Sequence, residues 1–132
     1  MHKRRLIASI INLTSIAGQR GFPTLGAYSA SNFARAGLTR TLALELAPHH
    51  ITANGIAPGI VWTEIWDRLA QAMSESDGEG KDKLDTFQEK VEALIPMKTA
   101  QLCEDIGDAA LYFANAPNTT GQILAVDGGY LA

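Results

Sequence analysis

Three polar side chains stand close together in the first third of the chain, and their spacing suggests that they serve one site. Ser15 follows a strongly apolar segment, at the place where the strands of open α/β sheets end and ligands bind. Tyr28 comes thirteen residues later, and Asn32 lies four residues after Tyr28, so that on a helix the last two side chains share one face. Ser15 and Tyr28 could therefore face one crevice and hydrogen-bond a ligand there, but this geometry by itself is generic.

Each of these residues also has an ordinary structural explanation. Ser15 can cap a turn or helix with its hydroxyl, Tyr28 can be a buried aromatic residue with a satisfied hydroxyl, and Asn32 can be a solvated helix residue. Taken one at a time, the three residues do not distinguish these explanations from a functional role. The elements that position them carry more information.

The elements around these residues are those of a parallel α/β sheet. Residues 6–14 are nearly all apolar and rich in β-branched side chains, which predicts a strand covered on both faces. Residues 27–47 contain no proline and end at Pro48, and an apolar residue recurs at every fourth position, which predicts one long helix; these positions are Ala30, Ala34, Leu38, Leu42 and Leu46. Residues 51–57 predict a second strand. The order strand, helix, strand favours a right-handed crossover.

The second half of the chain adds a charged loop and a closing strand. Helices are predicted over residues 63–73 and 85–94, separated by loop 74–85, which carries seven charged residues and two glycines. We interpret residues 64–98 as a lid over a substrate site, with a plain surface insertion as the alternative. A helix is expected over residues 103–115 and a last strand over residues 120–129. Residues 1–132 are expected to form a single domain.

Composition excludes several classes of protein. The chain has 132 residues, 46% of them apolar and 19% charged, which is typical of a globular domain and excludes a disordered or collagenous chain. Cys103 is the single cysteine, so an internal disulfide is excluded and the reducing cytoplasm is the expected compartment. No apolar run approaches the roughly 20 residues that span a bilayer, and no membrane association is expected.

Charge is unevenly distributed along the chain. Residues 1–66 carry six Lys or Arg and two Asp or Glu, whereas residues 67–132 carry five and twelve, which gives net charges of +4 and −7. The basic cluster at residues 1–5 holds only three cations and no aromatic residue, so no nucleic-acid binding is expected. His2, His49 and His50 lack the spacing of metal ligands, and no metal site is expected.

Four motifs in a fixed order cover nearly the whole chain. They are Asn12-Leu-Thr-Ser15-Ile-Ala-Gly18, Tyr28-Ser-Ala-Ser-Asn32, Ile51-Thr-Ala-Asn54-Gly-Ile-Ala-Pro58-Gly59-Ile-Val-Trp-Thr63, and Thr120-Gly-Gln122 with Asp127-Gly-Gly129. Together they resemble the C-terminal half of the short-chain dehydrogenase/reductase superfamily. The resemblance implies a partial Rossmann-like, doubly wound parallel sheet of about three strands with flanking helices. It also implies a nicotinamide cofactor, NAD or NADP, and hydride transfer between that cofactor and a carbonyl or secondary alcohol.

The resemblance further implies a role for each matching residue. Ser15 would hydrogen-bond the substrate oxygen, and Tyr28 would be the general acid/base that exchanges a proton with it. The residues that contact the cofactor would be Tyr28, Asn32, Pro58, Gly59, Val61 and Thr63, with the Val61 backbone and the Thr63 hydroxyl holding the carboxamide. Asn54 would be a structural polar anchor, and the strand from Gly121 to Gly129 would pack against a neighbouring subunit.

Within the superfamily, three runs look most like acetoin/diacetyl reductases, butanediol dehydrogenases and polyol dehydrogenases: residues 28–33, 42–48 and 57–66. This similarity implies a small alcohol or ketone as substrate. Trp62 and Trp66, four residues apart, could line a small substrate pocket, or could equally be anchors of a core or an interface.

The chain departs from the family pattern at a catalytic position. The family has a lysine four residues after the tyrosine, where this chain has Asn32. A phenol ordinarily has a pKa near 10, so a tyrosine that acts as a base near neutral pH needs its anion stabilised. An ammonium group at about 4 Å supplies roughly 4 kcal/mol at an effective dielectric constant near 20. Asparagine can hydrogen-bond a ribose hydroxyl but has no charge, and we expect the Tyr28 chemistry to be severely weakened.

The sequence contains no Gly-rich strand-to-helix turn of the GxGxxG type, which would hold a pyrophosphate. The family's N-terminal half, which carries that turn, has no counterpart, and half of the fold is therefore expected to be absent. An open sheet of this kind invites association, so we expect a homo-oligomer formed through residues 27–47 and the C-terminal strand. Two functions remain open: a weakened NAD(P)-dependent oxidoreductase, and a non-catalytic pseudoenzyme fragment that acts through its oligomerisation surface.

Overall fold

A three-stranded parallel sheet forms the centre of the molecule. The computed structural model describes residues 8–76 and 80–132. Strands β1 (Ser9–Leu13), β2 (Thr52–Pro58) and β3 (Ile123–Val126) lie in the order β1-β2-β3, and both pairs are parallel. The three strands confirm the partial parallel α/β sheet expected from the sequence. Residues 6–7 of the predicted first strand, the basic cluster with His2, and Gly78 of the predicted loop lie outside the described residues.

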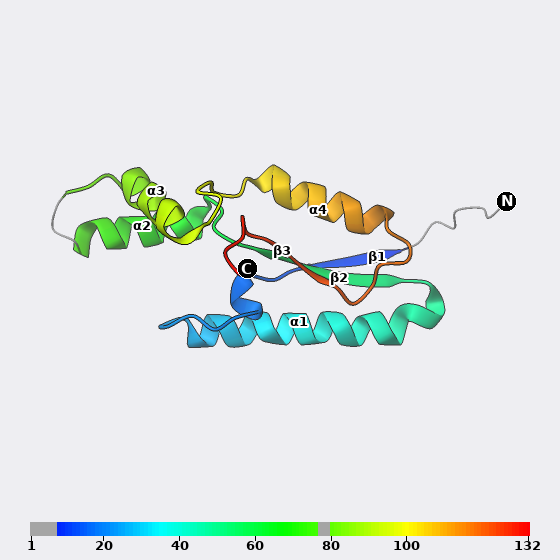
Figure 1. The fold of residues 1–132 in the computed structure, drawn as a ribbon. Helices are drawn as coiled ribbons and strands as arrows, with labels where there is room; N and C mark the ends of the chain where they lie inside the picture. The colour runs from blue at the N-terminus through cyan, green and yellow to red at the C-terminus, as the bar shows by residue number, and fades with distance from the viewer. Residues whose placement is uncertain (1–7, 77–79) are drawn as a thin grey trace.

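Helices cover both faces of this sheet (Figure 1). Helix α1 (Gly26–Leu46) lies along one face and α4 (Cys103–Asn115) along the other, while α2 (Glu64–Ser76) and α3 (Lys83–Leu94) pack together beyond the carboxyl ends of the strands. Two short 3₁₀ helices, η1 (Ile16–Gly18) and η2 (Ala47–His49), precede and follow α1.

The element boundaries lie mostly within one or two residues of the predicted ones, and the larger differences fall in two regions. Helices α2 and α3 reach into the predicted loop 74–85, ending at Ser76 and beginning at Lys83. The closing strand is shorter than residues 120–129, because Gly121, Gly128 and Gly129 have φ angles of 75°, 61° and 91°, which are incompatible with an extended strand.

The buried face of helix α1 is not the face that carries the predicted apolar repeat. The side chains against the sheet are small or polar: Ser29, Asn32, Ala36, Thr39 and Ala43. The predicted repeat lies largely on the outside, where Ala30 and Ala34 are exposed and Leu38 is 55% exposed. Small side chains allow a close approach: a Cβ atom at Gly18 of η1 would lie 2.7 Å from the backbone oxygen of Asn32. The i+4 repeat therefore indicated the helix correctly but not its buried face.

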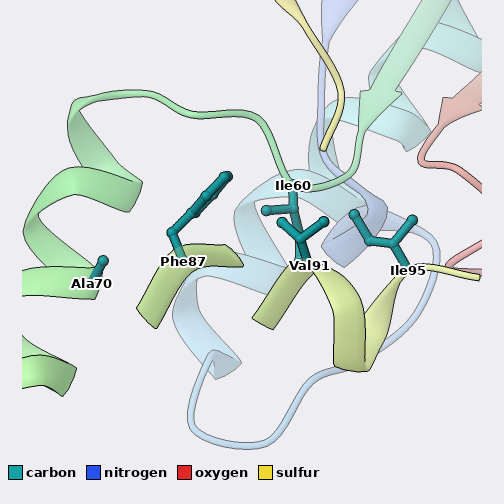
Figure 2. Packing of buried hydrophobic residues seen from close by; sticks show 5 residues of the cluster. All are labelled: Ile60, Ala70, Phe87, Val91 and Ile95. Carbon is teal, nitrogen blue, oxygen red and sulfur yellow. The ribbon is translucent and has the colours of Figure 1, made fainter. Parts of the chain in front are cut away.

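Two separate hydrophobic clusters stabilise the fold. The α4 cluster joins Ile56 of β2 to Ala109 and Phe113 of α4. The α2–α3 cluster is formed by Ile60 after β2, Ala70 of α2, and Phe87, Val91 and Ile95, of which Figure 2 shows Phe87 and Val91 on α3 with Ile95 at its end. The two clusters share no residue.

The sheet has an open edge at β1. Within the described residues β1 pairs with β2 alone, and its other edge carries no partner strand. From α1, Nη1 of Arg35 donates to the carbonyl oxygen of Leu13, the last residue of β1, at 3.4 Å. Among residues 8–76 and 80–132, no helix combines the length and the apolar character that a membrane crossing requires.

Candidate active site

Ser15 stands directly beyond the carboxyl end of β1. The β1–β2 ladder continues to the residue before it, since the amide of Thr14 donates to the carbonyl oxygen of Ile56 at 2.8 Å. Ser15 is the N-cap of η1, and its Oγ accepts a hydrogen bond from the amide of Ala17 at 3.1 Å. The capping explanation is therefore correct for the oxygen, while the hydroxyl proton remains available for a ligand.

Tyr28 lies in the first turn of α1, on the far side of the loop that follows η1. Its side chain is 45% exposed, so the alternative of a buried aromatic residue is wrong. Its hydroxyl makes no hydrogen bond within the described part of the chain. Its carbonyl oxygen accepts two, from Oγ of Ser31 at 2.8 Å and Nδ2 of Asn32 at 2.9 Å.

Asn32 is 1% exposed, so the alternative of a solvated helix residue is wrong. Its Nδ2 is engaged by the Tyr28 carbonyl, whereas its Oδ1, like Oγ of Ser29, is buried and has no hydrogen-bond partner among residues 8–76 and 80–132. The side chain thus offers an uncharged acceptor. Among the described residues no cation–π pair involves the Tyr28 ring, and the guanidinium of Arg35 donates to the Leu13 carbonyl.

Residues 58–63 form a turn beyond the carboxyl end of β2, at the same end of the sheet as Ser15. The amide of Gly59 donates to the carbonyl of Val126 at 2.9 Å, and a Cβ atom at Gly59 would lie 2.8 Å from Cα of Asp127. Val61 is buried and forms a bridge with Gln101. Thr63 is exposed, and its hydroxyl makes no hydrogen bond to the described residues.

Two buried residues that shape this turn were not predicted. Gln101 makes two hydrogen bonds to the backbone of Ile60. Its side-chain Oε1 accepts from the Ile60 N–H at 2.9 Å, and its backbone N–H donates to the Ile60 carbonyl oxygen at 3.0 Å. A single glutamine between two helices gives no sequence signal for this role. The carboxylate of Asp127 accepts from the amides of Gly129 and Leu131, each at 2.9 Å. The Asp-Gly-Gly order could have indicated that turn.

The tryptophans contact the α2–α3 cluster. Trp62 meets Phe87 edge to face with ring centroids 4.6 Å apart, and Trp66 does so at 5.6 Å. Both side chains are half-buried. The interpretation as core anchors therefore has direct support from contacts. Within residues 8–76 and 80–132, no group of three or more His, Cys, Asp or Glu side chains could hold a metal ion.

Asn54 has the contacts of a structural anchor. It is fully buried in β2, its Nδ2 donates to the Thr119 carbonyl at 2.8 Å, and its Oδ1 accepts from the Gln122 amide at 3.1 Å. It thus fixes the segment that leads into β3.

Replacing Asn54 by alanine is expected to lower the free energy of unfolding by about 2–4 kcal/mol, because two backbone groups lose their partners in a buried site. Urea denaturation followed by circular dichroism measures the change. Asn115→Ala, which removes an exposed amide bonded to the Leu111 carbonyl, is the matched control and should cost less than about 1 kcal/mol. Equal losses for the two variants would contradict the anchor role.

Comparison with known proteins gives three kinds of match. The family model described as enoyl-(acyl carrier protein) reductase matches residues 1–131. The L-2,3-butanediol dehydrogenase of Corynebacterium glutamicum is 40% identical over 124 residues, which are 92% of this chain and 47% of that protein. The chain therefore spans about half the length of the curated relative.

Two solved structures have the same fold. A short chain dehydrogenase family protein from Francisella tularensis superposes with a TM-score of 0.88 and 26% identity, covering 96% of this chain and 52% of the other. The actinorhodin polyketide ketoreductase, solved with NADPH, gives a TM-score of 0.83 and 29% identity over 96% of this chain and 48% of the other.

Proposed function

This chain belongs to the short-chain dehydrogenase/reductase family, and on that premise we propose that it supplies the substrate- and nicotinamide-contacting part of an oxidoreductase. The reaction would transfer a hydride between NAD or NADP and a small carbonyl compound or secondary alcohol. The observation that supports this proposal is that Ser15 and residues 59–63 directly follow the carboxyl ends of β1 and β2, where open α/β sheets bind ligands. Helix α1, which carries Tyr28 in its first turn, packs against η1 just after Ser15.

In the proposed reaction the chain's own residues handle the oxygen of the substrate. Ser15, whose Oγ already accepts from Ala17, donates its proton as a hydrogen bond to that oxygen. The exposed phenol of Tyr28 gives the oxygen a proton during reduction and takes it back during oxidation. The bound nicotinamide would supply or accept the hydride.

The residues fit one part of the cofactor. Thr63 has an exposed hydroxyl, without a hydrogen bond to the described residues, that could bind the carboxamide. Pro58, Gly59 and Val61 lie at and just after the end of β2, where Gln101 and Asp127 pack against the backbone. The sequence has no GxGxxG turn for the pyrophosphate. The proposed site within this chain is therefore the nicotinamide end, with Tyr28 and Asn32 beside the ribose.

The proposed substrate is a small diol, polyol or acetoin-like ketone. The name of the Corynebacterium relative, which is 40% identical, favours this class. Residues 64–98, with α2 and α3, would be the lid that covers the substrate. The compartment we propose is the cytoplasm, since the single cysteine, Cys103, is free and exposed.

A second candidate function is favoured by the neutral, buried side chain of Asn32, which supplies no cation to Tyr28. The chain would then be a pseudoenzyme that acts through an oligomerisation surface on α1 and β3. Large apolar side chains are exposed on both elements: Tyr28, Phe33, Leu38, Leu44 and Leu124. An active oxidoreductase could also form a homo-oligomer. Observing an oligomer would therefore not distinguish the oxidoreductase from the pseudoenzyme.

The test is an assay of the purified chain, alone and joined to the N-terminal half of a relative, with NADH or NADPH and acetoin, diacetyl or a polyol. The absorbance of the reduced cofactor reports turnover. Tyr28→Phe is expected to lower the rate by about 10²- to 10⁴-fold, because the proton donor is lost. Tyr112→Phe, on the exposed side of α4, is the control and should leave the rate unchanged. Absence of saturable binding and turnover in both forms would leave only the second function.

A further inference from the structure

Tyr130 lies where three segments from distant parts of the chain meet. Its ring is 5.6 Å from the ring of Phe22, and the guanidinium carbon of Arg20 lies 4.9 Å from the Phe22 ring and 5.2 Å from the Tyr130 ring. The same tyrosine packs against the α2–α3 cluster. One side chain near the C-terminus thus contacts both the loop that follows Ser15 and the hydrophobic cluster that includes residues of α2 and α3.

The backbone that carries Tyr130 is firmly held. Both oxygens of the Asp127 carboxylate are occupied by amides on either side of Tyr130, those of Gly129 and Leu131. The amide of Met97 donates to the Gly128 carbonyl at 3.1 Å, which ties this turn to the segment after α3. The ring of Tyr130 therefore projects from a fixed base.

The loop it contacts is otherwise weakly attached. Residues 19–25 join η1 to α1, so they connect Ser15 to Tyr28. Their backbone bonds are local, from Gln19 and Arg20 to Ile16 and from Leu25 to Phe22. Within the described residues, no side chain of this loop makes a hydrogen bond or an ion pair to the rest of the molecule. The ring and cation–π contacts of Arg20 and Phe22 with Tyr130 link this loop to the C-terminal segment.

We propose that Tyr130 is a positioning residue that fixes the loop 19–25 to the α2–α3 pair, so that the loop and the lid hold one arrangement around the site. The cation–π and ring contacts are the physical link, and neither requires a ligand. The further step, that this arrangement sets the places of Ser15 and Tyr28 for a substrate, rests on the proposed function. The test below needs no activity, so failure of this proposal and failure of the proposed function are distinguishable.

Limited trypsin digestion of the full chain tests the link, because Arg20 is itself a cleavage site. Trypsin cleaves only when the loop is open. The rate of cleavage is therefore proportional to the population of the open form, provided that the loop opens and closes faster than it is cut. Tyr130→Ala is expected to raise the rate of cleavage after Arg20 about tenfold, while cleavage after Arg40, within α1, rises less than about twofold. Mass spectrometry of the early fragments gives both rates.

Two variants separate positioning from general stability. Tyr130→Phe retains the aromatic ring, so trypsin should cleave this variant after Arg20 at the wild-type rate. That result would show that the ring, and not the hydroxyl, makes the link. Tyr112→Ala, which removes an exposed tyrosine of α4, should leave cleavage after Arg20 unchanged. An unchanged rate in Tyr130→Ala would overturn the proposal. Equal acceleration after Arg20 and Arg40 would overturn it as well, since it would make Tyr130 a residue of global stability.

Discussion

Replacing Asn32 by lysine is expected to raise the rate of ketone reduction at neutral pH on the order of 10³-fold. The physical reason is the stabilisation of the Tyr28 anion by an ammonium charge, roughly 4 kcal/mol at about 4 Å and an effective dielectric constant near 20. In the structure Asn32 presents only a neutral amide, already bonded to the Tyr28 carbonyl. The rate is measured with NADH or NADPH and acetoin on the chain joined to the N-terminal half of a relative.

Two variants test whether charge at this position causes the gain. Asn32→Gln lengthens the side chain without charge and should stay near the rate of the unaltered protein. Asn115→Lys adds the same charge at the exposed end of α4 and should also have no effect. Thermal unfolding of Asn32→Lys and Asn32→Gln, with Asn115→Lys as reference, shows whether the protein still folds with a larger side chain at the buried position 32. If the protein with Asn32 is already as active as the Asn32→Lys variant, the electrostatic argument is wrong.

Phe113→Ala is expected to lower the free energy of unfolding by about 3–5 kcal/mol, which is the range for removing a buried aromatic side chain. Phe113 is 2% exposed and packs with Ile56 and Ala109 in the cluster between α4 and the sheet. A domain of this size has about 5–15 kcal/mol in total, so the variant should be close to unfolded at 37 °C. Urea denaturation monitored by circular dichroism gives the change.

The matched control is Phe33→Ala, the same substitution on the outer side of α1. Phe33 is 46% exposed in the single chain, and its removal should cost the monomer less than about 1 kcal/mol. A loss at Phe33 as large as that at Phe113 would mean that α1 is covered in solution, as the proposed oligomer requires. A small loss at Phe113 would contradict the assignment of the α4 cluster as a core.

The sequence was sufficient to predict the secondary structure of most of the fold. Helix 103–115 coincides with α4, and the predicted strands 6–14 and 51–57 overlap β1 and β2. The mainly apolar segment 6–14 indicated β1, because a strand covered on both faces needs apolar side chains along most of its length. The parallel order followed from the long helix between the first two strands. These features depend on local pattern, which a single sequence contains.

Long-range packing could not be predicted in the same way. The apolar repeat at Ala30, Ala34 and Leu38 shows that one side of α1 is apolar, but not which surface the helix contacts, and the structure buries small and polar residues instead. The burial of Asn32 depends on the close approach of η1 at Gly18. The role of Gln101 depends on a backbone pairing with Ile60, more than forty residues away in sequence.

The separation of the two hydrophobic clusters has a consequence for native-state fluctuations. Because the α2–α3 cluster and the α4 cluster have no residue in common, the α2–α3 pair can unfold locally while the sheet and α4 stay intact. Amide hydrogens of α3 would then exchange with solvent at a lower free-energy cost than those of β2. We therefore expect two cooperative units, of which the smaller opens more often than the whole molecule unfolds.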